Sequence, residues 1–373
     1  MECVKISDIT KSVCTGLNPR KNFTLNTKDA NNYYVTVKEI TSNKVVFSES
    51  TDKVNDDGLK IIQNRSHLEK GDVLFSGIGT IGKVAYIDFD TNNWNCSESV
   101  FILKPNDRIL GSFLFYVLQL QDVVRQYEAN SAGSIMKGVR KSTLVNITFP
   151  LPPLAVQKEI VEILDTFTGM IDNLQKELEQ RQKQFEYYRS KFFAYNEDEC
   201  DWFSLPMISE NCDRKRKPIK GSEREKGIYP YYGASGIVDY VKDYILDGDY
   251  LLISEDGANL VARNTPIAFS IDGKNWVNNH AHVIKFNSLN DQRFVEYYFN
   301  SIDLTPWISG GAQPKLNQEN LNKILIPYPS VERRNVIVDT LKSFEILISN
   351  IKQEIELRQK QYEYYREKLL SFE

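Results

Sequence analysis

The chain has 373 residues, 41% of them hydrophobic and 26% charged, and a net charge of −4. This composition is typical of a soluble protein with two or three domains, and no run of about 20 apolar residues could form a membrane-spanning helix. The acidic balance argues against a surface coated in positive charge but is compatible with local basic patches.

The beginning of the chain, MECVKISDIT, has no basic region followed by an apolar core, so we expect a cytoplasmic protein. The cysteines are odd in number and form no CxxC pair. They therefore predict free thiols in a reducing compartment and no metal site. These residues are Cys3, Cys14, Cys96, Cys200 and Cys212.

Residues 1–150 predict a first mixed domain of short strands, turns and a helix over Phe113–Tyr127. The stretch VLFSGIGTIGKVAYID reads as strands and hairpins. Two short basic clusters, NPRK and KGVRK, are candidate DNA contacts, although each alone is more typical of a solvated loop. Their candidate residues are Arg20, Lys21, Lys137, Arg140 and Lys141.

GIGTIG, from Gly77 to Gly82, satisfies the GxGxxG pattern of dinucleotide-binding and methyl-donor-binding loops. Such a site requires a helix directly after the glycines, whereas KVAYID alternates like a strand. The stretch also approaches a phosphate loop, but Val84 offers no hydroxyl for magnesium. We therefore expect no cofactor.

Residues 151–195 predict a long helix that begins after the proline-rich FPLPPL, and residues 327–373 predict another after IPYPSV. Apolar residues recur at alternating spacings of four and three in both, the pattern of a coiled coil. An arginine interrupts both seams at the same place, and a buried charge there would set the alignment of the pair. Two amphipathic helices on separate domains are the alternative. The central seam residues are Leu174, Leu178, Arg181, Phe185 and Tyr188, and Ile351, Ile355, Arg358, Tyr362 and Tyr365.

Residues 196–326 predict a second mixed domain with strands in DYLLISEDGANLVARNTPIAFSID and a helix over Phe294–Ile302. The run RKRK, Arg214, Lys215, Arg216 and Lys217, is the densest basic cluster of the chain. His280 and His282 could share one face of a strand, but no adjacent cysteine or carboxylate completes a metal site. We therefore expect a strand edge or a DNA-facing loop there.

The two halves are tandem copies of one unit. RQKQFEYYR begins at Arg181 and RQKQYEYYR begins at Arg358, an offset of 177 that also maps Pro150 onto Pro327 and Phe167 onto Phe344. The helices hardly diverge, whereas the globular regions diverge strongly. If the helices pair antiparallel, the molecule has a pseudo-twofold axis, like a homodimer made from one chain.

The stretches YPYYGASGIVDYV, SGGAQPKLNQENLNKILIPYPS and FPLPPLAVQKEIVEILD resemble the specificity subunit of type I restriction-modification systems over the whole chain. The resemblance implies an α+β protein with two target-recognition domains and two conserved helices. It implies no catalysis, recognition of an asymmetric two-part sequence in double-stranded DNA, and assembly with two adenine methyltransferase subunits and with restriction subunits. In agreement, the sequence contains no paired-carboxylate nuclease motif and no Asn/Asp-Pro-Pro-Tyr methyltransferase motif.

Under this hypothesis the RKRK cluster contacts phosphates, and polar or aromatic residues in turn-like stretches read bases. The candidates for base reading are Ser76, Thr80, Lys137 and Arg140, with Tyr231, Tyr232, Ser235, Asn259, Gln313 and Lys315. Tyr187 and Tyr364 lie off the seam, either available to a methyltransferase subunit or packed on their own domain. The alternatives are a stand-alone DNA-binding protein, such as a repressor or architectural factor, and a protein-interaction scaffold.

Overall fold

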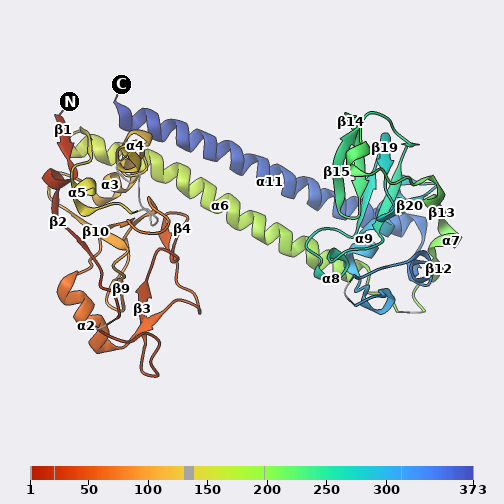
Figure 1. Ribbon diagram of the computed structural model, residues 1–373, viewed down its shortest axis with the longest axis horizontal. Helices are drawn as coiled ribbons and strands as arrows, with labels where there is room; N and C mark the ends of the chain where they lie inside the picture. Colours follow the sequence, from red (N-terminus) through yellow and green to blue (C-terminus); the bar gives the residue numbers. More distant parts are fainter. Residues whose placement is uncertain (1, 21, 130–137, 197, 312, 373) are drawn as a thin grey trace. The chain divides into compact units, whose positions relative to one another are not determined.

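A computed structural model describes residues 2–20, 22–129, 138–196, 198–311 and 313–372. The chain forms two compact units, one of Met1–Leu174 with Glu354–Glu373 and the other of Gln175–Gln353 (Figure 1). Each unit contains one globular region and parts of both long helices, so the units divide each helix in its middle.

The first unit is a mixed α/β body built on the four-stranded sheet β2-β10-β7-β8, with the pair β1-β11 and the three-stranded sheet β6-β3-β9 beside it. β1 pairs antiparallel with β11, so the first and last strands of the region lie together. The strands are β1 (Glu2–Lys5), β2 (Thr10–Thr15), β3 (Asn32–Val35), β4 (Ile40–Thr41), β5 (Lys44–Val45), β6 (Lys53–Val54), β7 (Val73–Ser76), β8 (Val84–Tyr86), β9 (Trp94–Cys96), β10 (Val100–Pro105) and β11 (Thr148–Leu151). The helices before the first long one are α1 (Ile6–Ile9), α2 (Asp56–Arg65), α3 (Gly111–Val117), α4 (Gln121–Ala129) and α5 (Lys141–Val145).

The second unit repeats this plan, with the four-stranded sheet β13-β20-β17-β18, the pair β12-β21 and the sheet β15-β14-β19-β16. The parallel pair β14-β19 corresponds to β3-β9 of the first unit. The strands are β12 (Asp201–Ser204), β13 (Glu210–Asn211), β14 (Lys226–Gly233), β15 (Gly236–Val241), β16 (Leu246–Asp247), β17 (Tyr250–Ser254), β18 (Ala268–Ile271), β19 (Lys274–Val277), β20 (Ala281–Lys285) and β21 (Leu325–Tyr328). The helices are α7 (Leu205–Ile208), α8 (Asn259–Ala262), α9 (Leu289–Ser301) and α10 (Gln318–Leu321), with 3₁₀ turns η1 (Asp213–Lys215), η2 (Gly221–Glu223) and η3 (Thr305–Trp307).

The central strands are buried on both faces, which explains why their sequences are continuous apolar runs. All four residues of β7 and all five of β17 are buried. β8 follows the GIGTIG turn and pairs antiparallel with β7, which confirms the strand expected there. The repeated sheet order confirms a duplicated α+β fold.

The helix predicted over Phe113–Tyr127 is two helices, α3 and α4. The amide groups of Gln119 and Leu120 bond carbonyls three residues back, at 3.1 and 3.0 Å, which tightens the chain into a turn between them. This break redirects α4 so that its apolar face also enters the core, where Tyr127 is 4% exposed.

The long helices are α6 (Leu154–Phe192) and α11 (Val331–Ser371), and they pack antiparallel within each unit. In the first unit Phe167 stacks on Tyr365 with ring centres 5.3 Å apart. In the second unit Tyr188 stacks on Phe344 at 5.5 Å. An advance of 21 residues along α6, from 167 to 188, thus matches a retreat of 21 along α11, from 365 to 344.

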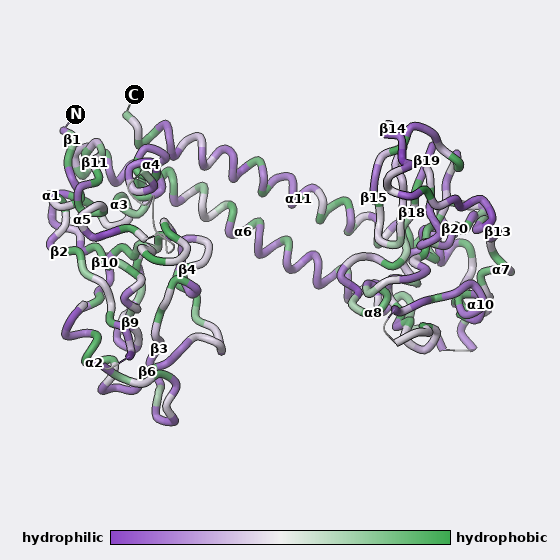
Figure 2. The backbone as a smooth tube through the Cα atoms, in the orientation of Figure 1, coloured by the Kyte–Doolittle hydropathy of each residue, from purple (hydrophilic) through white to green (hydrophobic). Residues whose placement is uncertain are grey.

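The seam residues pack as a heptad pattern predicts, with one difference. Ile351, Ile355 and Tyr362 are buried, and Figure 2 shows hydrophobic and hydrophilic residues alternating along both helices. Arg181 and Arg358 are not buried charges, because each side chain is 37% exposed and pairs with a glutamate four residues earlier in its own helix. The remaining predicted seam residues are half-buried or, for the two tyrosines stacked above, partly exposed.

The first unit's core joins the apolar face of α6 to the end of α11, where Tyr362 and Leu370 lie among Ile160, Leu164 and Ile171.

No described helix is both long enough and apolar enough to cross a bilayer.

Candidate nucleic-acid interface

In the first unit, one strand end is tied to two loops by backbone contacts. The Gly77 amide donates to the Ser99 carbonyl at 2.9 Å, and the Gly77 carbonyl accepts from the Val139 amide at 2.8 Å. Ile78 also forms a β-bridge with Gly138. The turn after β7, the loop before β10 and the loop before α5 therefore meet.

The second unit has the same three links. The Glu255 amide donates to the His280 carbonyl at 2.9 Å, the Glu255 carbonyl accepts from the Leu316 amide at 2.7 Å, and Asp256 bridges Lys315. We call this arrangement the loop frame. Its outer positions are Ile78, Ser99 and Gly138 in the first unit and Asp256, His280 and Lys315 in the second.

The interior of the loop frame differs between the units. In the first, a Cβ on Gly77 would lie 2.3 Å from Cε2 of Phe101, so the glycine makes room for the aromatic ring. At the corresponding places the second unit has Glu255 and His282, because β17 and β20 pair in the same manner as β7 and β10. An apolar contact in one unit is thus replaced by an ionic network in the other.

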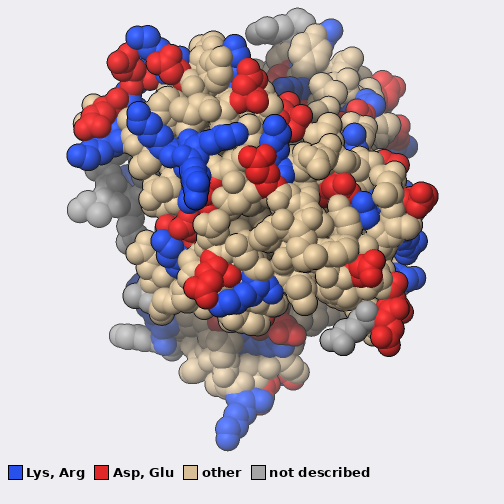
Figure 3. Space-filling model, turned by 90° about the vertical axis from the view of Figure 1, so that its right-hand side faces the viewer, with Lys and Arg blue, Asp and Glu red and all other residues tan. Residues whose placement is uncertain are grey.

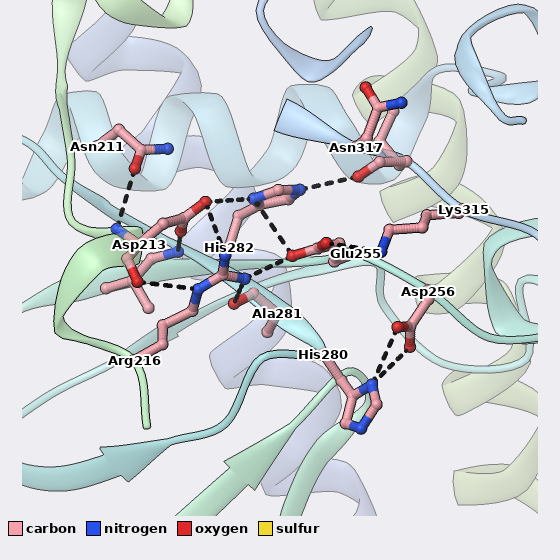
Figure 4. Close-up of polar contacts among 12 residues, drawn as sticks. Asn211, Asp213, Arg216, Glu255, Asp256, His280, Ala281, His282, Lys315 and Asn317 are labelled. Atoms are coloured by element: carbon pink, nitrogen blue, oxygen red, sulfur yellow. Dashed lines mark hydrogen bonds and ion pairs between the residues drawn. The ribbon is translucent and has the colours of Figure 1, made fainter. Parts of the chain in front are cut away.

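His282 is the centre of this network and is 1% exposed (Figure 4). Its Nδ1 lies 2.6 Å from Oδ2 of Asp213, and its Nε2 lies 2.8 Å from the carbonyl oxygen of Leu316. Both ring nitrogens therefore lie against groups that accept hydrogen bonds. Burial alone would raise the pKa of Asp213, but the hydrogen bond and charge of His282 hold it below its ordinary value.

Arg216 connects the carboxylates of Asp213 and Glu255, whose side chains are mostly buried. Its guanidinium lies 3.2 Å from Asp213 and 2.5 Å from Glu255, and it donates to the Ala281 carbonyl at 2.9 Å. Lys315 reaches the other oxygen of Glu255 at 3.2 Å. Burial opposes ionisation of Glu255, but Arg216, His282 and Lys315 together keep its pKa below the ordinary range. The network therefore fixes the loop before α10 against the end of β17.

The two main basic segments occupy equivalent places beside the loop frame. The Leu17 amide donates to the Cys96 carbonyl at 3.3 Å, and the Lys217 amide donates to the Val277 carbonyl at 3.1 Å. NPRK follows the first contact, and RKRK ends at the second. Figure 3 shows basic side chains on one face of the second unit, the largest group of them with acidic side chains around it. Each loop frame therefore has a basic segment next to it, as expected of a DNA-binding surface.

Residues 1–181 and 203–357 match the sequence model of a protein family, the type I restriction modification DNA specificity domain. The chain belongs to this family. The description of the family names DNA specificity in type I restriction-modification, which favours the expectation from the sequence over the stand-alone alternative.

Several similar proteins are described as type I specificity subunits. A putative type I restriction enzyme specificity subunit of Haemophilus influenzae is 37% identical over 183 residues, 47% of each chain. The EcoR124I/EcoR124II specificity subunit of Escherichia coli is 30% identical over 80% of each chain. The crystal structure of the type I S subunit from M. genitalium has a TM-score of 0.62 at 17% identity, over 99% of this chain and 96% of that one. This chain spans about half the length of the first relative and four fifths of the second.

The structure places most of the predicted DNA-contacting residues of this specificity subunit on the surface, at or near the loop frames. The hydroxyl group of Ser254 donates to the Ala234 carbonyl, which brings the β14–β15 turn and its exposed Ser235 to the strand end. Arg140 and Lys141 begin α5 directly after Gly138. The exposed predicted residues are Arg20, Thr80, Arg140, Lys141, Arg214, Lys215, Lys217, Ser235, Gln313 and Lys315, while Lys21 and Lys137 lie outside the described residues.

The other five predicted contacts are buried or half-buried: Ser76, Arg216, Tyr231, Tyr232 and Asn259. Ser76 is buried, where its hydroxyl donates to the Thr80 carbonyl at 2.6 Å and so closes the turn after β7. Tyr231 is 1% exposed and accepts from the Ile219 amide at 2.9 Å. Buried groups of this kind shape loops, so in this structure they are not open to a ligand.

Arg216 is only 15% exposed at its side chain, which distinguishes it from the rest of RKRK. Asn259 closes a surface loop through hydrogen bonds to the amide and carbonyl of Thr265, both at 3.0 Å. Tyr232 is half-buried, with its ring 6.0 Å from that of Phe269. Because its charge is paired with Asp213 and Glu255, we assign Arg216 to the scaffold of the loop frame.

Sequence reasoning did not include Glu255, Asp256 and His280 among the site residues. The HAH stretch predicted a strand edge or a DNA-facing loop at His280, and the other signal was the replacement of SGIG at the end of β7 by SEDG at the end of β17. That change put charge at a duplicated turn, but the distant partners of those charges became evident only in the fold. The described residues contain no group of three or more histidine, cysteine or acidic side chains that could hold a metal ion, and all five cysteines are free.

Tyr187 and Tyr364 present the same surface twice. Each side chain is 59% exposed, and each ring packs edge-on against the next tyrosine at 5.3 Å. Lys191 and Lys368 lie over the two rings at 5.8 and 5.7 Å. Neither tyrosine is part of a unit's buried core, whereas Tyr362, on the same helix as Tyr364, is.

Proposed function

We propose that this subunit reads an asymmetric two-part sequence in double-stranded DNA, one half-site with each globular region, and directs adenine methylation and restriction by its partner subunits. The observation that carries this proposal is the loop frame: its backbone is the same in both units and its side chains differ. Equivalent positions with different chemistry read different bases, so the target is not a palindrome.

The remaining assignments follow from the same division. Residues 1–150 and 196–326 are the two target-recognition domains, and residues 151–195 and 327–373 are the conserved helices that set the distance between half-sites. One of the solved structures with this fold bears a title on complex assembly in the type I restriction-modification system. By analogy, two copies of a methyltransferase subunit dock on the paired surfaces around Tyr187 and Tyr364, and restriction subunits join the full complex in the cytoplasm.

The basic segments supply affinity without sequence preference, because lysine and arginine next to phosphates release counterions whatever the bases are. Exposed Arg214, Lys215 and Lys217 are our phosphate contacts in the second unit, and Arg20 is one in the first. Ser235, Gln313 and Lys315 read or position bases in the second half-site, and Thr80 and Arg140 do so in the first.

A domain exchange tests the proposal. Replacing residues 196–326 with the same region of a relative is expected to change one half of the methylated sequence and leave the other half intact, as read by methylome sequencing of cells that contain the methyltransferase subunit. Replacement of residues 1–150 is the matched control and is expected to change the opposite half. An exchange that rewrites both halves contradicts the proposal.

A heptad inserted in both helices, near Leu174 and Ile351, tests the spacing. It lengthens each helix by roughly 10 Å at 1.5 Å per residue, which corresponds to about three base pairs. The bases are expected to stay the same while the gap lengthens, or binding is lost because the groove has rotated. A change in the bases read would refute this role for the helices.

A further inference from the structure

His280 presents an exposed side chain from a fixed backbone. Its carbonyl accepts from the Glu255 amide at 2.9 Å, and its amide donates to Oδ1 of Asn278 at 2.8 Å. The side chain is 49% exposed. Reading a base requires this combination of a held main chain and a side chain open to the groove.

Asp256 fixes the ring and determines which nitrogen carries hydrogen. Nδ1 of His280 lies 2.9 Å from both carboxylate oxygens of Asp256, whose side chain is 15% exposed. Since an ionised carboxylate only accepts, the hydrogen is on Nδ1, and in the neutral ring Nε2 is a bare acceptor. Figure 4 shows the second ring nitrogen directed away from Asp256 and from the buried network.

The equivalent position in the first unit shows that the frame does not need this side chain. The Ser99 carbonyl accepts from Gly77 at the same 2.9 Å that joins His280 to Glu255. Because the backbone alone makes the link, the side chain at this position is free to differ between units. The neighbouring position differs as well, with exposed Ile78 in place of Asp256.

We propose that His280 is a base-reading residue of the second half-site and that its Nε2 accepts a hydrogen bond from the exocyclic amino group of adenine or cytosine. Those amino groups are the donors that the major groove displays. The inference rests on the proposed function, because it takes double-stranded DNA as the ligand. Exposed Lys217 lies on a segment that flanks this loop and is suited to hold a phosphate beside it.

The other two histidines differ in ways that supply a control. His282 uses both ring nitrogens inside the protein. His67 is 73% exposed and lies 3.4 Å from Glu69 in the first unit, outside the loop frame. His67 thus matches His280 as an exposed histidine beside a carboxylate but lacks the position that reading requires.

The experiment uses the full chain with its methyltransferase partner in cells, and methylome sequencing is the readout. H280S installs the side chain that the first unit carries at this position, so the frame is retained. We expect H280S to relax one base position of the second half-site, with discrimination at that position reduced roughly 5- to 100-fold, and to leave the first half-site unchanged. H67S is expected to change neither half.

D256N tests the acceptor itself. An asparagine amide can donate to Nδ1 as well as accept from it, so either ring nitrogen can then carry hydrogen. We expect D256N to admit guanine or thymine, which display acceptors, at the position where wild type selects adenine or cytosine.

Two outcomes would overturn the inference: an unchanged second half-site in H280S, or an equal loss of methylation at all sites with the bases unaltered, which indicates a phosphate contact. Failure of the proposed function itself looks different, because the wild-type chain would then yield no two-part methylated sequence.

Discussion

Replacing Arg216 with alanine is expected to destabilise the second unit, whereas replacing Arg214 with alanine is expected to weaken DNA binding. The two arginines belong to one basic run, but only Arg216 has its charge committed to buried partners. Arg214 is exposed, so its charge is available to phosphates.

The magnitude for R216A follows from the burial of the groups left behind. The side chains of Asp213 and Glu255 are 8% and 12% exposed, and breaking a buried pair costs about 3–5 kcal/mol. His282 and Lys315 still contact the two carboxylates, which places the expected loss near 3 kcal/mol in free energy of unfolding. For a unit of this size that is a fall of roughly 6–12 °C in Tm.

Hydrogen exchange read by mass spectrometry would check this, because it reports on each unit separately. Peptides that cover β20 contain the Val283 amide, which donates to Asp213 at 2.7 Å, and they should exchange faster in R216A. Peptides that cover β7 in the first unit should not change.

R214A is the matched control and is expected to shift stability by less than about 0.5 kcal/mol. Its DNA affinity should fall for all sequences alike, and the slope of log K against log salt should flatten by about 0.9 if it makes one phosphate contact. The reasoning is refuted if R216A is as stable as wild type, or if R214A unfolds the second unit.

Three further predictions concern the rest of the chain. Changing Tyr187 and Tyr364 to alanine together should lower affinity for the methyltransferase subunit by about tenfold or more without shifting Tm, as measured by titration calorimetry; equal affinity would remove them from the interface. The depressed pKa values of Asp213 and Glu255 stabilise the fold above the ordinary carboxylate pKa of about 4. That stability is lost as pH falls through the depressed values, so thermal scans should show the second unit weakening below about pH 4, and less steeply in E255Q. The isolated chain should bind no S-adenosylmethionine, because a strand follows the Gly77–Gly82 turn; micromolar binding by calorimetry would contradict this.

Much of the fold could be predicted because its signals are local or repeated. The heptad pattern of α6 and α11 and the apolar runs of β7 and β17 depend on periodicity, which a single sequence displays directly. The offset of 177 residues then carries each assignment from one copy to the other. The break between α3 and α4 was missed because residues on both sides of it are good core residues.

The site was harder to predict, because burial depends on contacts far along the chain. Arg216 looks like its exposed neighbours in RKRK, and only its pairing with Glu255, 39 residues further on, separates it from them. Tyr231 looks like an aromatic reader until its hydroxyl is seen to bond Ile219 inside the unit. The sequence predicted only a strand edge or a DNA-facing loop at His280, because its partner Asp256 lies on a different loop.

The placement of the end of α11 in the core of the first unit has a consequence for the chain during its synthesis. Tyr362 and Leu370 cover the apolar face of α6 around Leu164, but roughly 180 residues separate the two parts of this unit in sequence. At about 5–20 residues per second, the apolar face of α6 therefore stays exposed for some 10–40 seconds before the ribosome has synthesised the end of α11. We expect a nascent chain stalled after the first long helix to be prone to aggregation and sensitive to proteases. It should become resistant to proteolysis only once the last helix has emerged.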